Sequence, residues 1–295
     1  MSVRFFGFAI LASAFFASCD VIPYRDAKEI RVINVDTNDT EEIAKKVILL
    51  EDYTGHTCGN CPGAAREAKR LEGLYPGRVV VMGVHVGFFA RPKNFSNGSY
   101  RVDYRTPAGD ALDAKFGPSA AGLPKGLVNR GRFGKSTVDV MGATEWEARI
   151  AQILQEEPIG IKLDVTPAFS ASNRNLSVKV ETKFQKDFAD NLKMAVYLVE
   201  DSIVSWQKEY DRNFSPVEDV PNYVHMHVLR SDLLPASGTD VVTTAPAVTG
   251  TTLSSTWTMT LANAIKEKHC KVIAVLYRTD NDEVIQTEEV HLPKN

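Results

Sequence analysis

The chain has 295 residues, of which 44% are hydrophobic and 24% charged, and its formal net charge is -3. This length suits two ordinary domains, because single domains cluster near roughly 100–150 residues. The small negative charge, without any stretch rich in Lys and Arg, excludes a basic surface for phosphate backbones. We therefore expect a globular protein of two domains that has no nucleic acid among its partners.

The N-terminal segment 1–18 is predicted to be an export signal. Arg4 precedes an apolar run from Phe5 to Phe16, and this run is too short to span a membrane. The residues from Phe16 to Cys19 look like the lipobox of bacterial lipoproteins, a resemblance that implies cleavage before Cys19 and lipidation of that cysteine. Several acyl chains on Cys19 would anchor the chain stably to a membrane. An ordinary cleavable signal is the alternative.

After a polar tether at 19–45, which can hold one strand at 29–35, the pattern of residues 46–158 predicts an α/β domain. The expected elements, in chain order, are a strand at 47–53, an amphipathic helix at 62–75, a strand at 78–86, a helix at 106–116, a strand at 126–130 and a helix at 144–157. The order of strand, helix and strand at its start is a βαβ unit. Glycine and aromatic residues without a period predict a long surface loop at 87–105.

Residues 159–295 are predicted to form an all-β antiparallel sandwich. Short apolar runs, several of them separated by turn signals, predict strands at 159–165, 176–183, 193–200, 223–229, 254–261, 271–278 and 283–292. Cys270 adjoins one of these apolar runs and is expected to be a packed free thiol without a chemical role.

The segment from His56 to Ala65 carries Cys58 and Cys61 at the expected start of the first helix. A thiolate is the reactive form of cysteine, and the amides at a helix N-terminus favour negative charge. Cys61, one turn further along, would resolve a mixed disulfide formed at Cys58. Pro62 fits this arrangement, because first-turn amides lack intrahelical acceptors, and the helix can therefore begin at Cys58. The pattern predicts a redox pair.

These residues resemble the thioredoxin superfamily, whose active site combines a strand, a short turn, Cys-x-x-Cys and a helix. Asp52 stands where the superfamily has a buried acid that accepts a proton from the resolving thiol, although Glu51 is a rival for this role. Leu123-Pro124 resembles the cis-proline segment, so Pro124 is expected to face the cysteines and to shape the groove for a thiol or disulfide protein partner.

A second resemblance covers nearly the whole chain. The lipobox, the segments 49–64, 122–130 and 223–230, and the C-terminal VIAVLYRTDNDEVIQ together look like the thioredoxin-like outer-membrane lipoprotein family of Bacteroidetes. The resemblance implies an α/β thioredoxin-like domain followed by a β-domain, and an outer-membrane location. It also brings a suggested role as a surface antigen or adhesin.

Three interpretations of the cysteine pair stay open, and no cofactor is expected with any of them. Zinc needs about four ligands, which Cys58 and Cys61 could supply together with His225 and His227. These two histidines are expected on one face of a strand, while His56 and His85 lack a partner at suitable spacing. A permanent disulfide in a surface binding protein is the second alternative, with the aromatic loop 87–105 as a possible binding surface. Thiol–disulfide exchange is the function we favour.

Overall fold

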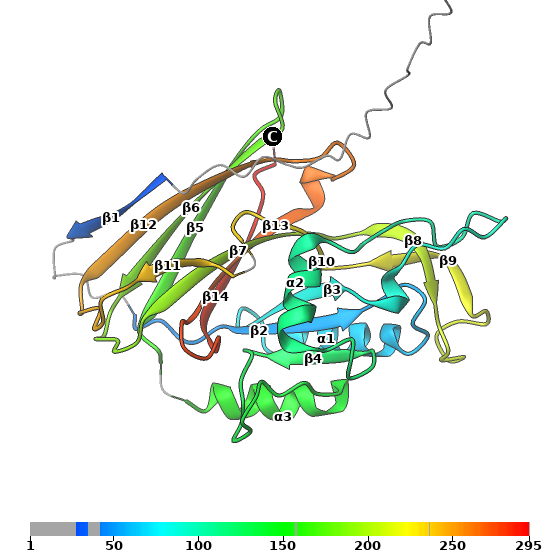
Figure 1. Ribbon diagram of the computed structural model, residues 1–295, viewed down its shortest axis with the longest axis horizontal. Coiled ribbons are helices and arrows are strands. Elements are labelled where there is room, and N and C mark those ends of the chain that lie inside the picture. Colours follow the sequence, from blue (N-terminus) through cyan, green and yellow to red (C-terminus); the bar gives the residue numbers. More distant parts are fainter. Residues whose placement is uncertain (1–27, 35–41, 157, 236, 295) are drawn as a thin grey trace, which may run out of the picture.

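The computed structural model describes residues 28–34, 42–156, 158–235 and 237–294, so the signal segment and Cys19 lie outside the described residues. Figure 1 shows a mixed sheet with helices on both of its faces and a second sheet of antiparallel strands beside it. The expectation of an α/β region followed by a β-rich region with antiparallel sheets is confirmed at this level.

The α/β region follows the predicted order of elements. They are β2 (Ile48–Thr54), α1 (Cys61–Leu74), β3 (Val79–His85), the short 3-10 helix η1 (Phe88–Ala90), α2 (Pro107–Phe116), β4 (Lys125–Val128) and α3 (Ala143–Leu154). β2 pairs in parallel with β3 and antiparallel with β4. Thr106 caps α2, and its hydroxyl accepts a hydrogen bond from Gly109 N at 3.0 Å.

Both faces of β2 and β3 are buried, which explains why their sequences are almost uninterrupted apolar runs. Ile48 and Leu50 of β2 belong to the cluster that α1 and α3 cover. Leu49 and Tyr53 point to the other face and belong to the cluster that α2 covers. The alternation of side chains along β2 therefore decides which groups lie beneath α1.

The β-rich region begins after residue 158 and also includes the early strand β1 (Lys28–Asn34), at the place where the tether could hold a strand. Its further elements are β5 (Ile161–Ser170), β6 (Asn175–Phe184), β7 (Leu192–Glu200), β8 (Ile203–Lys208), β9 (Asp219–His225), β10 (Val228–Asp232), β11 (Thr239–Val242), β12 (Thr251–Thr260), η2 (Glu267–His269), β13 (Cys270–Arg278) and β14 (Val284–His291). One sheet has the strand order β1-β12-β6-β5.

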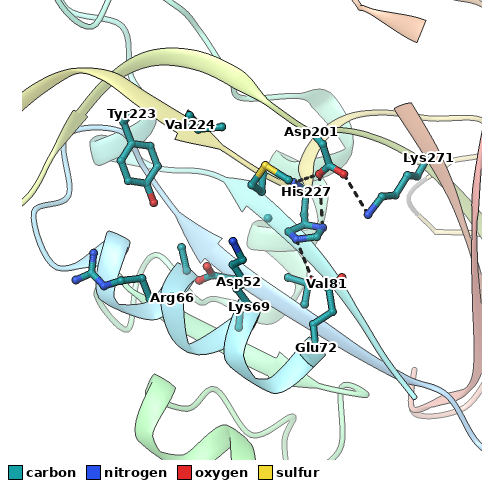
Figure 2. A pocket seen from close by; sticks show the side chains of 14 residues that line it. Asp52, Arg66, Lys69, Glu72, Val81, Asp201, Tyr223, Val224, His227 and Lys271 are labelled. Carbon is teal, nitrogen blue, oxygen red and sulfur yellow. Dashed lines mark hydrogen bonds and ion pairs between the residues drawn. The ribbon is translucent and has the colours of Figure 1, made fainter. Parts of the chain in front are cut away.

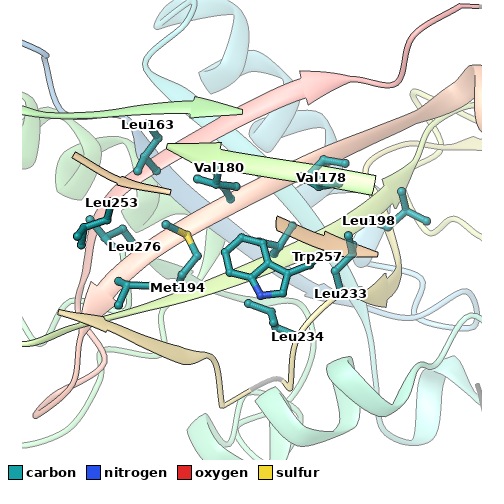
Figure 3. Close-up of a cluster of buried hydrophobic side chains, with 14 of the residues drawn as sticks. Leu163, Val178, Val180, Met194, Leu198, Leu233, Leu234, Leu253, Trp257 and Leu276 are labelled. Atoms are coloured by element: carbon teal, nitrogen blue, oxygen red, sulfur yellow. The ribbon is translucent and has the colours of Figure 1, made fainter. Parts of the chain in front are cut away.

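This sheet packs against the antiparallel part of the larger sheet through a single hydrophobic core (Figure 3). Trp257 of β12 is 3% exposed and lies in this core with Val178 of β6 and Met194 of β7. Burial of such large apolar side chains is the main stabilising contribution to a layered fold.

The larger sheet runs through both halves of the chain, with the strand order β14-β13-β7-β10-β3-β2-β4 and β11 paired to β7. Its halves meet where Val228 of β10 pairs in parallel with Gly83 of β3. The prediction of one strand at 223–229 is wrong, because His227 has φ 55 and separates β9 from β10. The division into domains at residue 158 stays a prediction, and the sheet itself crosses that boundary.

Candidate functional site

Cys58 and Cys61 form a disulfide where β2 leads into α1. Their Cα atoms lie 5.4 Å apart, and the two residues are 3% and 1% exposed. The prediction that the helix begins at Cys58 is wrong, because α1 begins at Cys61 and the amide of Cys58 donates to Gly55 O in a preceding turn. Pro62 lies in the first turn of α1, as predicted.

Two segments distant in sequence close over this turn. On one side, the side-chain amide of Gln207 donates to Cys58 O at 3.0 Å, and Tyr210 N donates to Gly59 O at 2.9 Å. On the other side, the amide and the hydroxyl of Thr57 both donate to Phe89 O. The disulfide is therefore shielded from solvent by the connection between β8 and β9 and by the loop after β3.

Asp52 and Glu51, the two candidates for the buried acid, point to opposite faces of the sheet. Glu51 forms an ion pair with Arg130, with Arg130 Nη2 2.8 Å from Glu51 Oε1, and both side chains are almost fully buried. Asp52 alternates with Glu51 and shares its face with Leu50, beneath α1. Only Asp52 thus lies on the face of the sheet that carries the disulfide helix.

The carboxyl group of Asp52 is buried, and its Oδ1 has no hydrogen-bond partner among the described residues. Burial raises the pKa of Asp52 from 3.8 to about 7. A carboxyl group with this pKa can take up or release a proton near neutral pH. The role of Asp52 in proton transfer to the cysteine pair stays a prediction.

Asp52 lines a pocket of about 480 Å³ beside α1 (Figure 2). The pocket also contains a charged network: His227 lies 3.7 Å from Glu72 and 3.6 Å from Asp201, and Lys271 Nζ lies 3.1 Å from Asp201. Tyr223 lines the same pocket, and burial, followed by the nearby charge of Asp52, raises the pKa of its hydroxyl to about 12. Asp52 and this charged network thus line the same pocket.

Pro124 directly precedes β4, whose first residue Lys125 pairs with Tyr53 of β2. The Leu123–Pro124 peptide bond is cis. The register brings the start of β4 beside the end of β2, from which the chain continues into the cysteine turn. The role of Pro124 toward a partner stays a prediction.

The structure brings together three histidines that have no regular spacing in the sequence. His85 and His225 each pack against the ring of Tyr104, at centroid distances of 4.9 and 5.1 Å, and His56 lies 5.9 Å from the same ring. All three rings are buried, and burial lowers the pKa of each histidine. The cluster therefore holds neutral rings packed on an aromatic side chain.

The zinc alternative receives no support from this arrangement. Among residues 28–34, 42–156, 158–235 and 237–294, no group of three or more His, Cys, Asp or Glu side chains is placed to hold a metal ion. The expectation that His225 and His227 share a strand face is wrong, since His227 follows β9 and lines the pocket while His225 packs on Tyr104. Cys58 and Cys61 are bound to each other.

The aromatic loop at 87–105 is divided between core and surface. Tyr100 and Tyr104 are buried, whereas Phe88 and Phe95 are 62% and 51% exposed. The exposed rings line a hollow of about 620 Å³ that reaches Tyr210, the residue that covers the cysteine turn. Exposed aromatic rings beside such a hollow are suited to contact with another molecule.

The lipid anchor expected at Cys19 falls on a residue outside the described ranges. Within those ranges, the structure contains no helix that is long and apolar enough to cross a membrane.

No curated protein matches the chain. HBP35 of Porphyromonas gingivalis has a TM-score of 0.55 at 16% identity, covering 84% of this chain and 76% of that protein, which shows a shared fold. A protein from Agrobacterium tumefaciens has a TM-score of 0.48 at 14% identity, covering 87% and 98%. A domain of the outer membrane lipoprotein Omp28 from Porphyromonas gingivalis has a TM-score of 0.29 at 16% identity, covering 45% and 88%.

The family model described as outer membrane protein Omp28 matches residues 109–295, which is more than half of the chain. This match confirms the family resemblance drawn from the sequence and the expected outer-membrane location. The chain belongs to the Omp28 family of outer membrane proteins.

Proposed function

We propose that this protein is an exported thiol–disulfide oxidoreductase with a thioredoxin-like domain, acting through Cys58 and Cys61. The observation that carries the proposal is the disulfide at the start of α1, on the sheet face where Asp52 keeps a buried carboxyl oxygen without a partner. Parallel pairing of β2 with β3 and antiparallel pairing with β4 support the thioredoxin-like assignment.

In the disulfide form, a thiolate of a reduced partner protein attacks Cys58 Sγ. The Cys58–Cys61 bond breaks, and Cys61 Sγ leaves with the electron pair and takes a proton from the carboxyl group of Asp52. A second thiolate of the partner then attacks the partner's own sulfur in the mixed disulfide, which forms the disulfide of the partner and releases Cys58 as a thiolate. The partner is oxidised by two electrons and the cysteine pair is reduced.

The same steps in reverse reduce a disulfide of a partner. Cys58 attacks as a thiolate, and Asp52, now a carboxylate, accepts the proton of Cys61 as that thiol attacks the mixed disulfide. A pKa of about 7 lets Asp52 serve in both directions near neutral pH. Pro124, at the start of β4, is proposed to shape the groove in which the partner chain lies.

We further propose that the mature chain is anchored to the outer membrane by lipid on Cys19. The lipobox-like segment from Phe16 to Cys19 supports this anchor. Mass measurement of the mature N-terminus tests it directly. An acylated Cys19 is the expected result, and an unmodified start at another residue would remove the anchor.

The test of the exchange function is capture of partners by Cys61→Ala in the organism that makes the protein. Without the resolving thiol, a mixed disulfide at Cys58 accumulates and can be isolated under non-reducing conditions. Cys58→Ala is the matched control, because it keeps one cysteine of the pair but lacks the proposed attacking thiol. Capture by Cys61→Ala alone is expected, and equal capture by both variants or by neither contradicts the proposal.

A second function, a surface binding or adhesin-type protein with a permanent disulfide, is favoured by one observation. The exposed rings of Phe88 and Phe95 line a hollow beside the cysteine turn, while both sulfurs are buried. In that case the double variant Cys58→Ala/Cys61→Ala retains the binding activity, whereas Phe88→Ala/Phe95→Ala loses it. Cell attachment measured with both double variants separates the two functions.

A further inference from the structure

Residues 207–214, which comprise the last two residues of β8 and the start of its connection to β9, lie across the turn that carries the cysteine pair, and we name this segment the strap. Two backbone hydrogen bonds join it to the turn. Lys208 N donates to His56 O at 2.8 Å, and Tyr210 N donates to Gly59 O at 2.9 Å. The strap is therefore joined to the turn both before Cys58 and after it.

The ring of Tyr210 lies directly on Gly59. A Cβ atom at Gly59 would lie 2.5 Å from carbon atoms of this ring, so the close contact requires glycine at that position. Tyr210 itself is 53% exposed. The ring therefore shields the turn between the cysteines while about half of its own surface stays in water.

Arg66 connects the strap to α1. Its Nη1 lies 2.6 Å from Glu209 Oε2, and its guanidinium carbon lies 3.6 Å from the ring centroid of Phe214. Glu209 is buried with the strap in place, whereas Arg66 and Phe214 are in contact with solvent. If the strap lifts, both charges return to water, so opening leaves no buried charge without a partner.

The side-chain amide of Gln207 adds a hydrogen bond from the strap to Cys58 O at 3.0 Å, and the strap is carried by the hairpin of β8 and β9. β8 and β9 form a two-stranded sheet that pairs with no further strand within the described residues. A two-stranded hairpin is at best marginally stable by itself, and segments with exposed side chains open at a lower free energy than the core. The exposed residues Val204 of β8 and Val224 of β9 show that one face of this hairpin lacks apolar packing.

We propose that the strap is a displaceable cover that regulates thiol exchange at Cys58, an inference that rests on the function proposed above. A partner thiolate must reach Cys58 Sγ, and this residue is 3% exposed with the strap closed. Exchange therefore follows opening of the strap, and its rate depends on the fraction of molecules in which the strap is open. A partner that displaces Tyr210 from Gly59 thereby gains access to the disulfide.

The test measures how fast dithiothreitol reduces the Cys58–Cys61 disulfide in the folded protein. Tyr210→Ala removes the ring from the turn, and Glu209→Gln removes the ion pair with Arg66. Each variant is expected to be reduced about tenfold faster than wild type or more, because the open fraction grows when a contact of the closed state is lost. The free thiols are quantified by mass spectrometry after rapid alkylation.

Matched controls change similar groups that do not touch the turn. Glu67→Gln removes an acid of α1 that pairs with Arg70, and Leu74→Ala removes an exposed apolar side chain at the end of α1. Both controls are expected to stay within about twofold of the wild-type rate. Equal rates in wild type, Tyr210→Ala and Glu209→Gln would overturn the proposal.

Hydrogen exchange of the wild-type protein tests the strap without any substitution. The amides of Lys208 and Tyr210 are expected to exchange much faster than those of β2, because the strap opens while the sheet stays closed. Protection of the strap equal to that of β2 would contradict a displaceable cover. This hydrogen-exchange result does not depend on whether the cysteine pair exchanges with partners. A failure of the proposed exchange function would instead appear as a lack of partners captured by Cys61→Ala.

Discussion

Glu51 and Arg130 form a bidentate ion pair in the interior, with Arg130 Nη2 2.8 Å and Nε 3.1 Å from the two carboxylate oxygens. Arg130 Nη2 also donates to the hydroxyl of Tyr197 at 3.3 Å. Glu51 belongs to β2, Arg130 follows β4, and Tyr197 belongs to β7. The ion pair therefore lies where the two halves of the chain meet. Because Glu51 is held on this face, Asp52 points to the face of the disulfide helix.

Arg130→Met is expected to destabilise the protein by about 3–5 kcal/mol, because Glu51 is then a buried charge without a partner. The double variant Glu51→Leu/Arg130→Met lacks both charges and should recover most of this loss. Urea unfolding of the three proteins measures the difference. A double variant as unstable as Arg130→Met would show that packing of the arginine, and not its charge, is what matters.

The stability of the protein should depend on pH through Asp52. Burial raises the pKa of this carboxyl from 3.8 to about 7, so its contribution to stability is fully present below pH 3.8 and is lost as the pH rises to about 7. Asp52→Asn does not titrate. The free energy of unfolding of Asp52→Asn, measured relative to that of wild type, should therefore increase by up to about 4 kcal/mol between pH 4 and pH 8. A stability difference that is the same at both pH values contradicts a raised pKa.

The contribution of His225 to the stability of the protein should depend on pH with the opposite sign. Burial lowers its pKa from 6.5 to about 4, so its contribution is present above pH 6.5 and is lost as the pH falls toward 4. The loss amounts to roughly 3 kcal/mol at most. His225→Phe keeps a ring against Tyr104 and should lose less stability than wild type between pH 6.5 and 4.5. Parallel curves for the two proteins in thermal unfolding would refute this assignment.

Cys270 is a buried free cysteine, as the sequence predicted. Burial raises the pKa of its thiol to about 12, and the reactive thiolate is therefore scarce at neutral pH. We expect iodoacetamide to leave Cys270 unlabelled in the folded protein and to label it fully in urea. Peptide mass spectrometry gives both values, and comparable labelling rates in the two conditions would show that this thiol is accessible.

Much of the local structure could be predicted from the sequence. The strand, helix and strand around the cysteine pair depend on patterns within about ten residues, such as the apolar run at Ile48–Thr54, and these patterns are local. The helix was predicted to begin at Cys58, whereas it begins at Cys61. Residue types alone do not distinguish the turn in which Cys58 N donates to Gly55 O from the first turn of a helix.

Contacts between distant segments could not be predicted. The strap reaches the turn through Tyr210, more than a hundred residues after Gly59, and no periodic signal marks such a contact. The same holds for the junction of β3 with β10 and for the packing of His85 and His225 on Tyr104. The strand β8 was not predicted, because its sequence mixes polar and apolar residues and only Gln207 of its six residues is buried.

The central claim, that Cys58 and Cys61 exchange thiols with partner proteins, is tested most directly by redox titration. The protein is equilibrated in glutathione buffers until the ratio of thiol to disulfide no longer changes, and this ratio is read by alkylation and mass. The account predicts a reversible transition with a midpoint between about -270 and -120 mV, the range of exchange catalysts. A pair that stays oxidised in every buffer, with a midpoint below about -300 mV, is a structural disulfide and would contradict the account.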